Sequence, residues 1–267
     1  MRKDFEIKEH YGIEDLLQIM RVLRGKDGCP WDREQNHESI RKNMIEETYE
    51  VVEAIDRKDS AMLCEELGDV LLQVVFHAQM EEEENGFDFD DVCDGICHKL
   101  ILRHPHIFGD VVAKTSEQVL KNWDEIKKKE KGQNTASDTL RSVPAVLPAL
   151  MRAEKVQHRA AKTGFDYSNA AEAMTDLKKE VVELEEAMAE DKAGHMQEEL
   201  GDVLFSAVNV ARLLHIDPEE ALTRSTEKFM DRFEKVERIA VQRGMDMSAS
   251  SMDELNALWA EAKKSTN

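Results

Sequence analysis

The sequence predicts an all-α protein made of two helical-bundle domains in tandem. Its 267 residues include only 12 Gly and 5 Pro, so there are few residues that break helices. Apolar residues recur at the 3.6-residue spacing of helices through long charged stretches, and no stretch alternates as a half-buried strand would. A quartet of acidic residues also occurs twice, with 133 residues between equivalent positions. The repeat favours two similar domains over one large one.

The first half begins with a helix predicted over about 13–23, whose apolar stripe is Leu16, Leu17, Met20 and Leu23. Residues 25–34 are expected to form a loop. A helix hairpin follows over about 39–55 and 61–83, and the polar stretch 56–60 between its helices offers Asp59 or Ser60 as an N-cap. The second hairpin helix has a predicted core stripe that consists of Leu67, Val70, Leu71, Val74, Val75 and Ala78.

After a loop at 85–88, a helix is predicted over about 92–103, where His104-Pro105-His106 ends it. Another helix is predicted over about 116–131. Residues 132–148 are polar, contain Pro144 and Pro148, and are expected to be a linker. The second half repeats the hairpin and ends with helices over about 218–242 and 252–263. We therefore predict an N-terminal domain at 1–131, a linker at 132–148 and a C-terminal domain at 149–267.

The acidic quartets predict two metal sites. Within each quartet the gaps are 3, 16 and 3 residues, so each contains two pairs that share a helix face. Each quartet is symmetric about a polar break, at residue 58 or 191, and a turn there would bring all four acids to one level, about 12 Å from the turn. Charge runs are usually solvated helix faces, but duplication and symmetry favour divalent-cation sites. The quartets are Glu47, Glu50, Glu66 and Asp69, and Glu180, Glu183, Glu199 and Asp202.

Other repeated residues could bind a nucleotide. Lys99 and Arg103, like Lys228 and Arg232, are four residues apart on a helix face, which suits phosphate oxygens, although most such pairs are surface charges. Trp123 and Trp259 lie in the last helix of each half, where they could stack on a base or simply belong to a core or interface. Gly68 and Gly201 each precede the Asp of a quartet, which suggests that a ligand or a neighbouring helix approaches the backbone there.

Charge and composition narrow the function classes. The net charge is −20, from 36 basic and 56 acidic residues, which argues against binding DNA or RNA through its phosphates. No apolar run approaches the roughly 20 residues of a membrane-spanning helix, and the N-terminus lacks a signal-peptide core. Cys29, Cys64, Cys93 and Cys97 follow neither a zinc nor a disulfide pattern, so we expect reduced thiols in the cytoplasm.

Several of these motifs resemble the MazG family of nucleoside triphosphate pyrophosphohydrolases. The likeness runs from about residue 13 to 263 and includes the order of the motifs. The matching segments are Gly28-Cys29-Pro30-Trp31-Asp32, Glu46-Glu47-Thr48-Tyr49-Glu50, Glu66-Leu67-Gly68-Asp69, Arg103-His104-Pro105-His106-Ile107-Phe108, Lys228-Phe229-Met230-Asp231-Arg232-Phe233 and Trp259.

The resemblance implies an all-α dimer that hydrolyses NTPs or dNTPs to the nucleoside monophosphate and pyrophosphate. It also implies Mg²⁺, with Mn²⁺ as an alternative ion, bound by the acids of the C-terminal copy. Lys228 and Arg232 would contact the phosphates, and Trp259 would lie near the nucleotide; Lys99, Arg103 and Trp123 are the candidates in the N-terminal copy. One departure is that Lys179 stands where the first copy has Glu46.

For the reaction we expect Glu183 or Glu50 to take a proton from the attacking water, at the α- or the β-phosphorus. A different class of function is a nucleotide sensor or partner-binding module without catalysis. A di-iron carboxylate bundle would need paired Glu-x-x-His motifs. Glu53 and Asp69 stand at the positions where that motif requires histidines, which argues against it.

Overall fold

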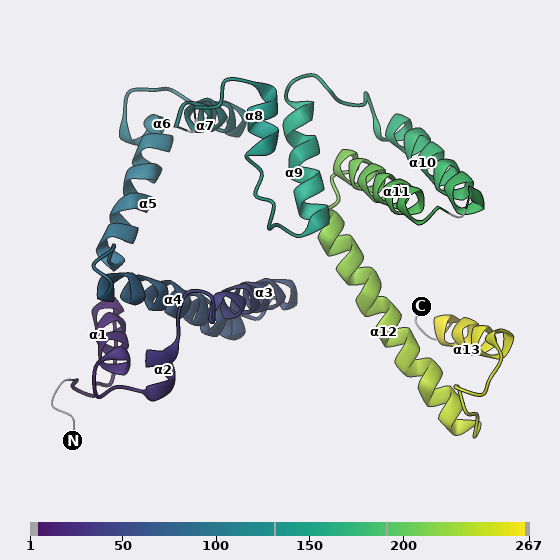
Figure 1. The fold of residues 1–267 in the computed structure, drawn as a ribbon, viewed down its shortest axis with the longest axis horizontal. Coiled ribbons are helices and arrows are strands. Elements are labelled where there is room, and N and C mark those ends of the chain that lie inside the picture. Colours follow the sequence, from purple (N-terminus) through teal and green to yellow (C-terminus); the bar gives the residue numbers. More distant parts are fainter. Residues whose placement is uncertain (1–4, 131, 191, 265–267) are drawn as a thin grey trace. The chain divides into compact units, whose positions relative to one another are not determined.

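The computed structural model describes residues 5–130, 132–190 and 192–264 (Figure 1), and these residues form helices and loops without a strand. The chain divides into two compact units, Met1–Ile126 and Lys127–Asn267. Unit 1 contains α1 (Ile13–Arg24), α2 (Pro30–Glu34), α3 (Arg41–Arg57), α4 (Ser60–Glu83), α5 (Phe89–Arg103), α6 (Pro105–Phe108) and the first part of α7 (Ser116–Glu130). Unit 2 contains α8 (Ala136–Arg141), α9 (Ala149–Ala161), α10 (Ala170–Glu190), α11 (Ala193–Leu213), α12 (Pro218–Gln242) and α13 (Met252–Lys264).

The turn between α3 and α4 lies at the predicted place. Lys58 ends α3 in the left-handed region, with φ at 54°. Its N–H donates to the carbonyl of Ile55, and the N–H of Asp59 donates to that of Ala54, which closes the end of the helix. The Asp59 side chain accepts hydrogen bonds from the N–H groups of Ala61 and Met62, so Asp59 is the N-cap of α4. This short turn fixes which faces of α3 and α4 meet.

The core of unit 1 lies against the second half of α4, where Val75, Phe76 and Met80 are buried with Met20 and Ile40. The predicted stripe on this helix is only partly right. Val75 and Ala78 are buried, but Leu67 and Leu71 are exposed within the chain. The reason is that α1 packs on the second half of α4, and α3 leaves those two leucines uncovered.

In unit 2, α10 and α11 form the second hairpin and α9 packs on α11. The predicted midpoint of its turn, Asp191, lies outside the described residues. Beyond the hairpin, α12 packs along α13, where Val236, Ala240, Leu258 and Ala262 form a small buried core. The beginning of α12 contacts α9, because the Met151 N–H donates to Glu219 at 3.3 Å.

Two segments contain helices where the sequence suggested only loop or linker. Residues 25–34 include α2, which begins at Pro30. Residues 132–148 include α8, whose N-terminus is closed by reciprocal hydrogen bonds between Thr135 and Asp138. Arg159 of α9 donates to Ser142 Oγ at 2.6 Å, so the end of α8 is held against α9.

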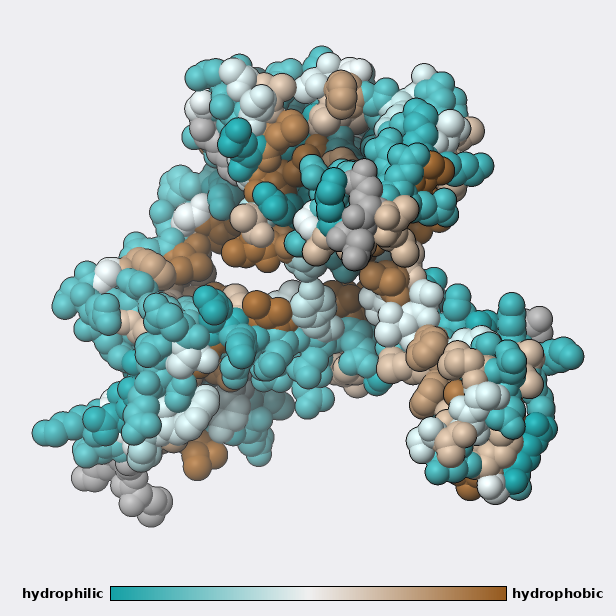
Figure 2. Space-filling model, turned by 45° about the vertical axis from the view of Figure 1, so that its right-hand side comes forward, coloured by the Kyte–Doolittle hydropathy of each residue, from teal (hydrophilic) through white to brown (hydrophobic). Residues whose placement is uncertain are grey.

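The surface carries many apolar side chains, seen as brown areas among the teal ones in Figure 2. Some of them occupy equivalent positions of the two hairpins: Leu67 is 51% exposed and Leu200 50%. Among the described residues, no helix combines the length and the apolar character needed to cross a membrane.

Candidate metal and nucleotide site

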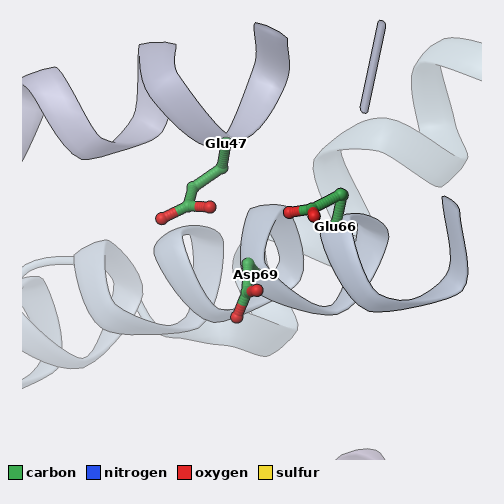
Figure 3. A group of neighbouring side chains, drawn as sticks. All are labelled: Glu47, Glu66 and Asp69. Carbon is green, nitrogen blue, oxygen red and sulfur yellow. The ribbon is translucent and has the colours of Figure 1, made fainter. Parts of the chain in front are cut away.

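The first acid cluster is formed by Glu47 of α3 with Glu66 and Asp69 of α4 (Figure 3). Each contributes one carboxylate oxygen to a group whose members all lie within 4.8 Å of one another. They converge because Glu47 and Glu66 lie on the facing sides of the two hairpin helices, and because Glu66 and Asp69 share one face of α4. Within the described chain no Lys or Arg forms an ion pair with these three acids, so their charges repel.

Burial and this repulsion act in the same direction on the pKa values of two of these acids. Partial burial, followed by the charge of Asp69, raises the pKa of Glu47. The pKa of Glu66 is raised by burial and then by the charge of Glu50. Carboxyl groups that resist ionisation because other carboxylates face them provide a favourable place for a divalent cation.

The second cluster repeats the first at the equivalent positions, with Glu180 of α10 and Glu199 and Asp202 of α11. Burial and the charge of Glu183 raise the pKa of Glu180. Glu199 is the most buried of these acids, at 9% exposed, and His195 Nε2 lies 3.1 Å from its Oε1. The position equivalent to His195 in the first copy is Met62, which cannot donate a hydrogen bond.

Glu50 and Glu183, the acids that we assigned as general bases, are not among the three converging groups of either copy. They still affect the converging acids: Glu50 contributes to the raised pKa of Glu47 and Glu66, and Glu183 contributes to the raised pKa of Glu180. In each copy three acids therefore converge and a fourth stands beside them.

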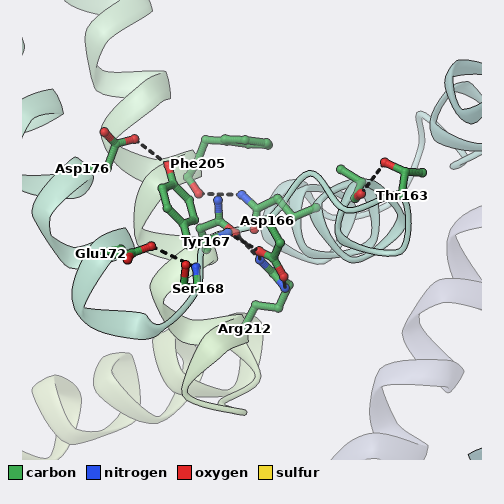
Figure 4. A network of polar contacts seen from close by, with 11 residues as sticks. Thr163, Asp166, Tyr167, Ser168, Glu172, Asp176, Phe205 and Arg212 are labelled. Atoms are coloured by element: carbon green, nitrogen blue, oxygen red, sulfur yellow. Dashed lines mark hydrogen bonds and ion pairs between the residues drawn. The ribbon is translucent and has the colours of Figure 1, made fainter.

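The loop before α10 makes side-chain contacts with both α10 and α11 (Figure 4). Tyr167 Oη donates to Asp176 of α10 at 2.6 Å, and this contact raises the pKa of Tyr167 to about 12. Asp166 pairs with both terminal nitrogens of Arg212, close to the end of α11. Asp176 lies one helical turn before Glu180, so these contacts hold the acid-bearing face of α10 against α11. The i, i+4 spacing of His195 with Glu199, and of Asp176 with Glu180, could have revealed both residues in the sequence, but we did not single them out.

The predicted phosphate and base contacts of the second copy gather elsewhere in unit 2. Arg232 of α12 lies over the Trp259 ring of α13, 6.0 Å from its centre, and Phe229 packs on the same ring at 5.1 Å. Arg232 Nε is buried and has no hydrogen-bond partner in the described parts of the chain. Lys228 is exposed. No hydrogen bond or ion pair among the described residues joins Lys228 or Arg232 to the acid cluster.

The candidates of the first copy lie near the end of α5. Lys99 is exposed and Arg103 is the last residue of that helix. The Trp123 ring meets the His104 ring edge-on, 4.8 Å between centres. Trp123 also borders a pocket of about 380 Å³ that includes Lys114 and Thr115. Trp123 therefore lies beside the segment that follows Arg103.

Among the described residues, no other element packs closely against either of the two mid-helix glycines. A Cβ added at Gly68 or Gly201 would meet nothing within 4 Å. Packing inside the chain therefore does not require glycine at either position, which overturns the helix-packing alternative for a single chain.

Fold and site together define a class: an all-α protein with duplicated carboxylate clusters, each on a helix hairpin. The chain belongs to the MazG family. The family's sequence model, described as the MazG nucleotide pyrophosphohydrolase domain, matches this chain twice, over residues 35–108 and 168–237. Each match includes one complete acidic quartet.

Similar proteins extend over nearly the whole chain. A nucleoside triphosphate pyrophosphohydrolase of Escherichia coli (strain K12) is 44% identical over 255 residues, which cover 94% of this chain and 97% of that protein. A nucleoside triphosphate pyrophosphohydrolase/pyrophosphatase MazG of Thermotoga maritima is 42% identical, covering 94% of this chain and 95% of its own. The uncharacterized protein YabN of Bacillus subtilis is 46% identical, over 96% of this chain and 52% of its own length.

Proposed function

We propose that this nucleoside triphosphate pyrophosphohydrolase uses Mg²⁺ held by its acid clusters to convert NTPs or dNTPs to the monophosphate and pyrophosphate. The observation that carries this proposal is the convergence of three carboxylates at equivalent places in two hairpins, with no ion pair to a Lys or Arg of the described residues. Each of the two proposed domains, residues 1–131 and 149–267, contains one cluster. With a net charge of −20, bridging cations are what would allow the chain to bind a polyanionic substrate.

The donor set fits Mg²⁺. Oxygen ligands suit hard cations, and Mg²⁺ is commonly bound by a few carboxylates together with substrate phosphates. Glu180, Glu199 and Asp202 would hold it in the second copy, and Glu47, Glu66 and Asp69 in the first; Mn²⁺ accepts similar ligands. A bound ion neutralises the triphosphate and lowers the pKa of a nearby water.

Other side chains would carry out proton transfer and substrate binding. Glu183, or Glu50 in the first copy, accepts the proton of the attacking water, because it stands beside the cluster without belonging to the converging three. The water oxygen bonds to the α- or β-phosphorus, and the oxygen that bridges these two phosphorus atoms leaves with the electron pair. Lys228 and Arg232 stabilise the developing charge on the phosphates. Trp259, which already packs against Phe229 and Arg232, provides an aromatic face for the base.

We propose further that the working form is a homodimer. The hairpin helix of each repeat leaves the same apolar positions exposed, Leu67 and Leu71 in one and Leu200 and Leu204 in the other. The helices that carry the Lys–Arg pairs do likewise with Leu100 and Phe229, each of which directly follows the lysine of its pair. A second copy of the chain would cover these faces and could bring a Lys–Arg pair to an acid cluster.

The four free thiols suit a reducing compartment, which we take to be the cytoplasm.

Product analysis tests this function directly. Each NTP and dNTP is incubated with the protein and Mg²⁺, and the products are separated chromatographically. We expect the monophosphate and intact pyrophosphate; a diphosphate with orthophosphate would contradict the assigned bond. Binding without any product would instead identify a nucleotide sensor.

The matched variants Glu199→Gln and Glu66→Gln decide which copy is catalytic. We expect Glu199→Gln to reduce pyrophosphate release by at least about a hundredfold, because it removes the most buried acid of the second cluster. Glu66→Gln removes the equivalent acid of the first. Undiminished turnover in a folded Glu199→Gln protein would show that the second cluster is not the catalyst.

A further inference from the structure

The two acid clusters differ in one contact that bears on how a cation would be bound. In the second copy His195 Nε2 is 3.1 Å from Glu199 Oε1. An ionised carboxylate can only accept a hydrogen bond, so Nε2 carries the hydrogen and donates it. His195 is the third residue of α11 and Glu199 lies one turn further on, so the helix itself holds the two side chains on one face.

The first copy has no such contact. Met62 takes the place of His195 on α4, and no ion pair involving Glu66 occurs within the described chain. Glu66 is also less buried than Glu199. One cluster therefore has a carboxylate held by an imidazole donor. In the other, the neighbour of the equivalent carboxylate is a further acid, Glu50, which offers no such donor when it is ionised.

The difference determines how many oxygens each glutamate can offer. The hydrogen bond keeps Oε1 of Glu199 directed at the imidazole, which favours coordination through a single oxygen. Glu66 can present both. Mg²⁺ requires near-octahedral geometry at about 2.0–2.1 Å, whereas Ca²⁺ takes 6–8 oxygens and readily accepts a carboxylate through both of its oxygens.

We infer that His195 is a positioning residue that makes the C-terminal cluster select Mg²⁺ over Ca²⁺, while the N-terminal cluster, with Met62, discriminates less. The inference rests on the proposed function, because it takes both clusters to be cation sites. Contacts to the ligand residues of a metal typically change its affinity by about 10–100-fold, so one hydrogen bond is enough to produce such a difference.

Calorimetric titration of the 267-residue chain with Mg²⁺ alone, and separately with Ca²⁺ alone, tests this inference about His195. One cluster is silenced by a double substitution, Glu47→Gln with Asp69→Asn or Glu180→Gln with Asp202→Asn, so that each site is measured by itself. At about pH 8, above the ordinary His pKa, we expect the ratio of the Ca²⁺ Kd to the Mg²⁺ Kd to be about tenfold higher at the C-terminal site.

A reciprocal exchange supplies the control. His195→Met should lower that ratio about tenfold at the C-terminal site, and Met62→His should raise it at the N-terminal site. His195→Gln, which retains an N–H donor, should preserve most of the selectivity, an outcome that a merely structural role would not produce. Circular dichroism establishes that each variant keeps its helices.

Two results would overturn the inference, and they differ from each other. If Mg²⁺ and Ca²⁺ bind but the ratio is unchanged in both His195→Met and Met62→His, His195 does not position Glu199. If neither ion binds to a folded protein with one intact cluster, the metal sites of the proposed function fail as well.

Discussion

Glu50 and Glu183 occupy equivalent positions, one turn beyond the first acid of each cluster, yet neither joins the three oxygens that converge. A group that binds the ion with its lone pairs is a poor proton acceptor, so the fourth acid of each copy is the better base. Its negative charge, which opposes ionisation of Glu180, also favours a cation in the neighbouring cluster. Metal binding and proton acceptance are thereby assigned to different acidic residues of the same quartet.

This division can be tested with Glu183→Gln. If Glu183 is the base, kcat should fall by about 10²–10⁴-fold, while the rise in Tm on adding Mg²⁺ is retained. The matched substitution Glu50→Gln should have the same effect only if the first copy also turns over substrate. Loss of the Mg²⁺-dependent rise in Tm together with activity would instead make Glu183 a metal ligand.

At the scale of elements, a histidine pair connects the segment before α3 to α4. His37 Nδ1 and His77 Nδ1 are 2.7 Å apart, so one nitrogen must donate and the other accept. His37 Nε2 also lies 3.1 Å from Glu81, one turn beyond His77 on α4. Burial, and then the neighbouring His37, lower the pKa of His77. The contact thus favours at least one neutral imidazole.

The sign of the resulting pH dependence follows. Because the pKa of His77 is lower in the folded chain, the unfolded chain binds more protons between the two pKa values. The free energy of unfolding should be greatest above about pH 6.5, the ordinary pKa of histidine, and should fall at lower pH. Urea unfolding at several pH values measures this.

Two variants identify which group causes this slope of the free energy of unfolding against pH. His77→Phe should flatten it between about pH 7.5 and 5.5, because the group that is held neutral has been removed. His98 is exposed on α5, so His98→Gln should leave the slope intact. An unchanged slope in the His77→Phe protein would refute the assignment.

At the scale of the whole molecule, the exposed apolar positions recur with the period of the repeat. Leu67 with Leu200, Leu71 with Leu204, and Leu100 with Phe229 are all uncovered in the single chain. Scattered apolar residues are normal on a surface, but the same set on both repeats is typical of faces that another subunit covers. Gly68 and Gly201, with open space around them, lie on the same helices.

A charge placed on one of these faces tests the dimer. Leu204→Lys should shift the molecular mass measured by light scattering towards that of the monomer, because burying an unpaired lysine at an interface is costly. Val146 is 92% exposed in the loop between α8 and α9, so Val146→Lys should leave the mass unchanged. If the unaltered chain has the monomer mass at every concentration, the proposed dimer is wrong.

The sequence predicted what depends on local spacing. The turn at residue 58 and the Asp59 cap follow from helical periodicity and capping chemistry, and the structure confirms both. Of each predicted acid quartet, the structure brings three members together. The apolar stripe on α4 was a different case. Periodicity identifies which residues share a face, but not what covers it, so Leu67 and Leu71 could not be separated from Val75 beforehand.

The remaining differences have local causes. Helix α8 lies in the predicted linker because the capping pair Thr135 and Asp138 outweighs the polar composition around it. His195 and Asp176 escaped notice because histidine and acid pairs at i, i+4 are common on exposed helices. Where Lys228 and Arg232 lie relative to the acids depends on how α12 packs, which motif spacing does not specify.

The two-residue link between α3 and α4 makes the chain sensitive to length at that point. An extra residue inserted after Asp59 would rotate the start of α4 by about 100° about its axis. Glu66 and Asp69 would then point away from Glu47, although every amino acid of the cluster was still present. For this molecule the number of residues in a tight corner is as much a part of the ion-binding chemistry as the carboxylates themselves.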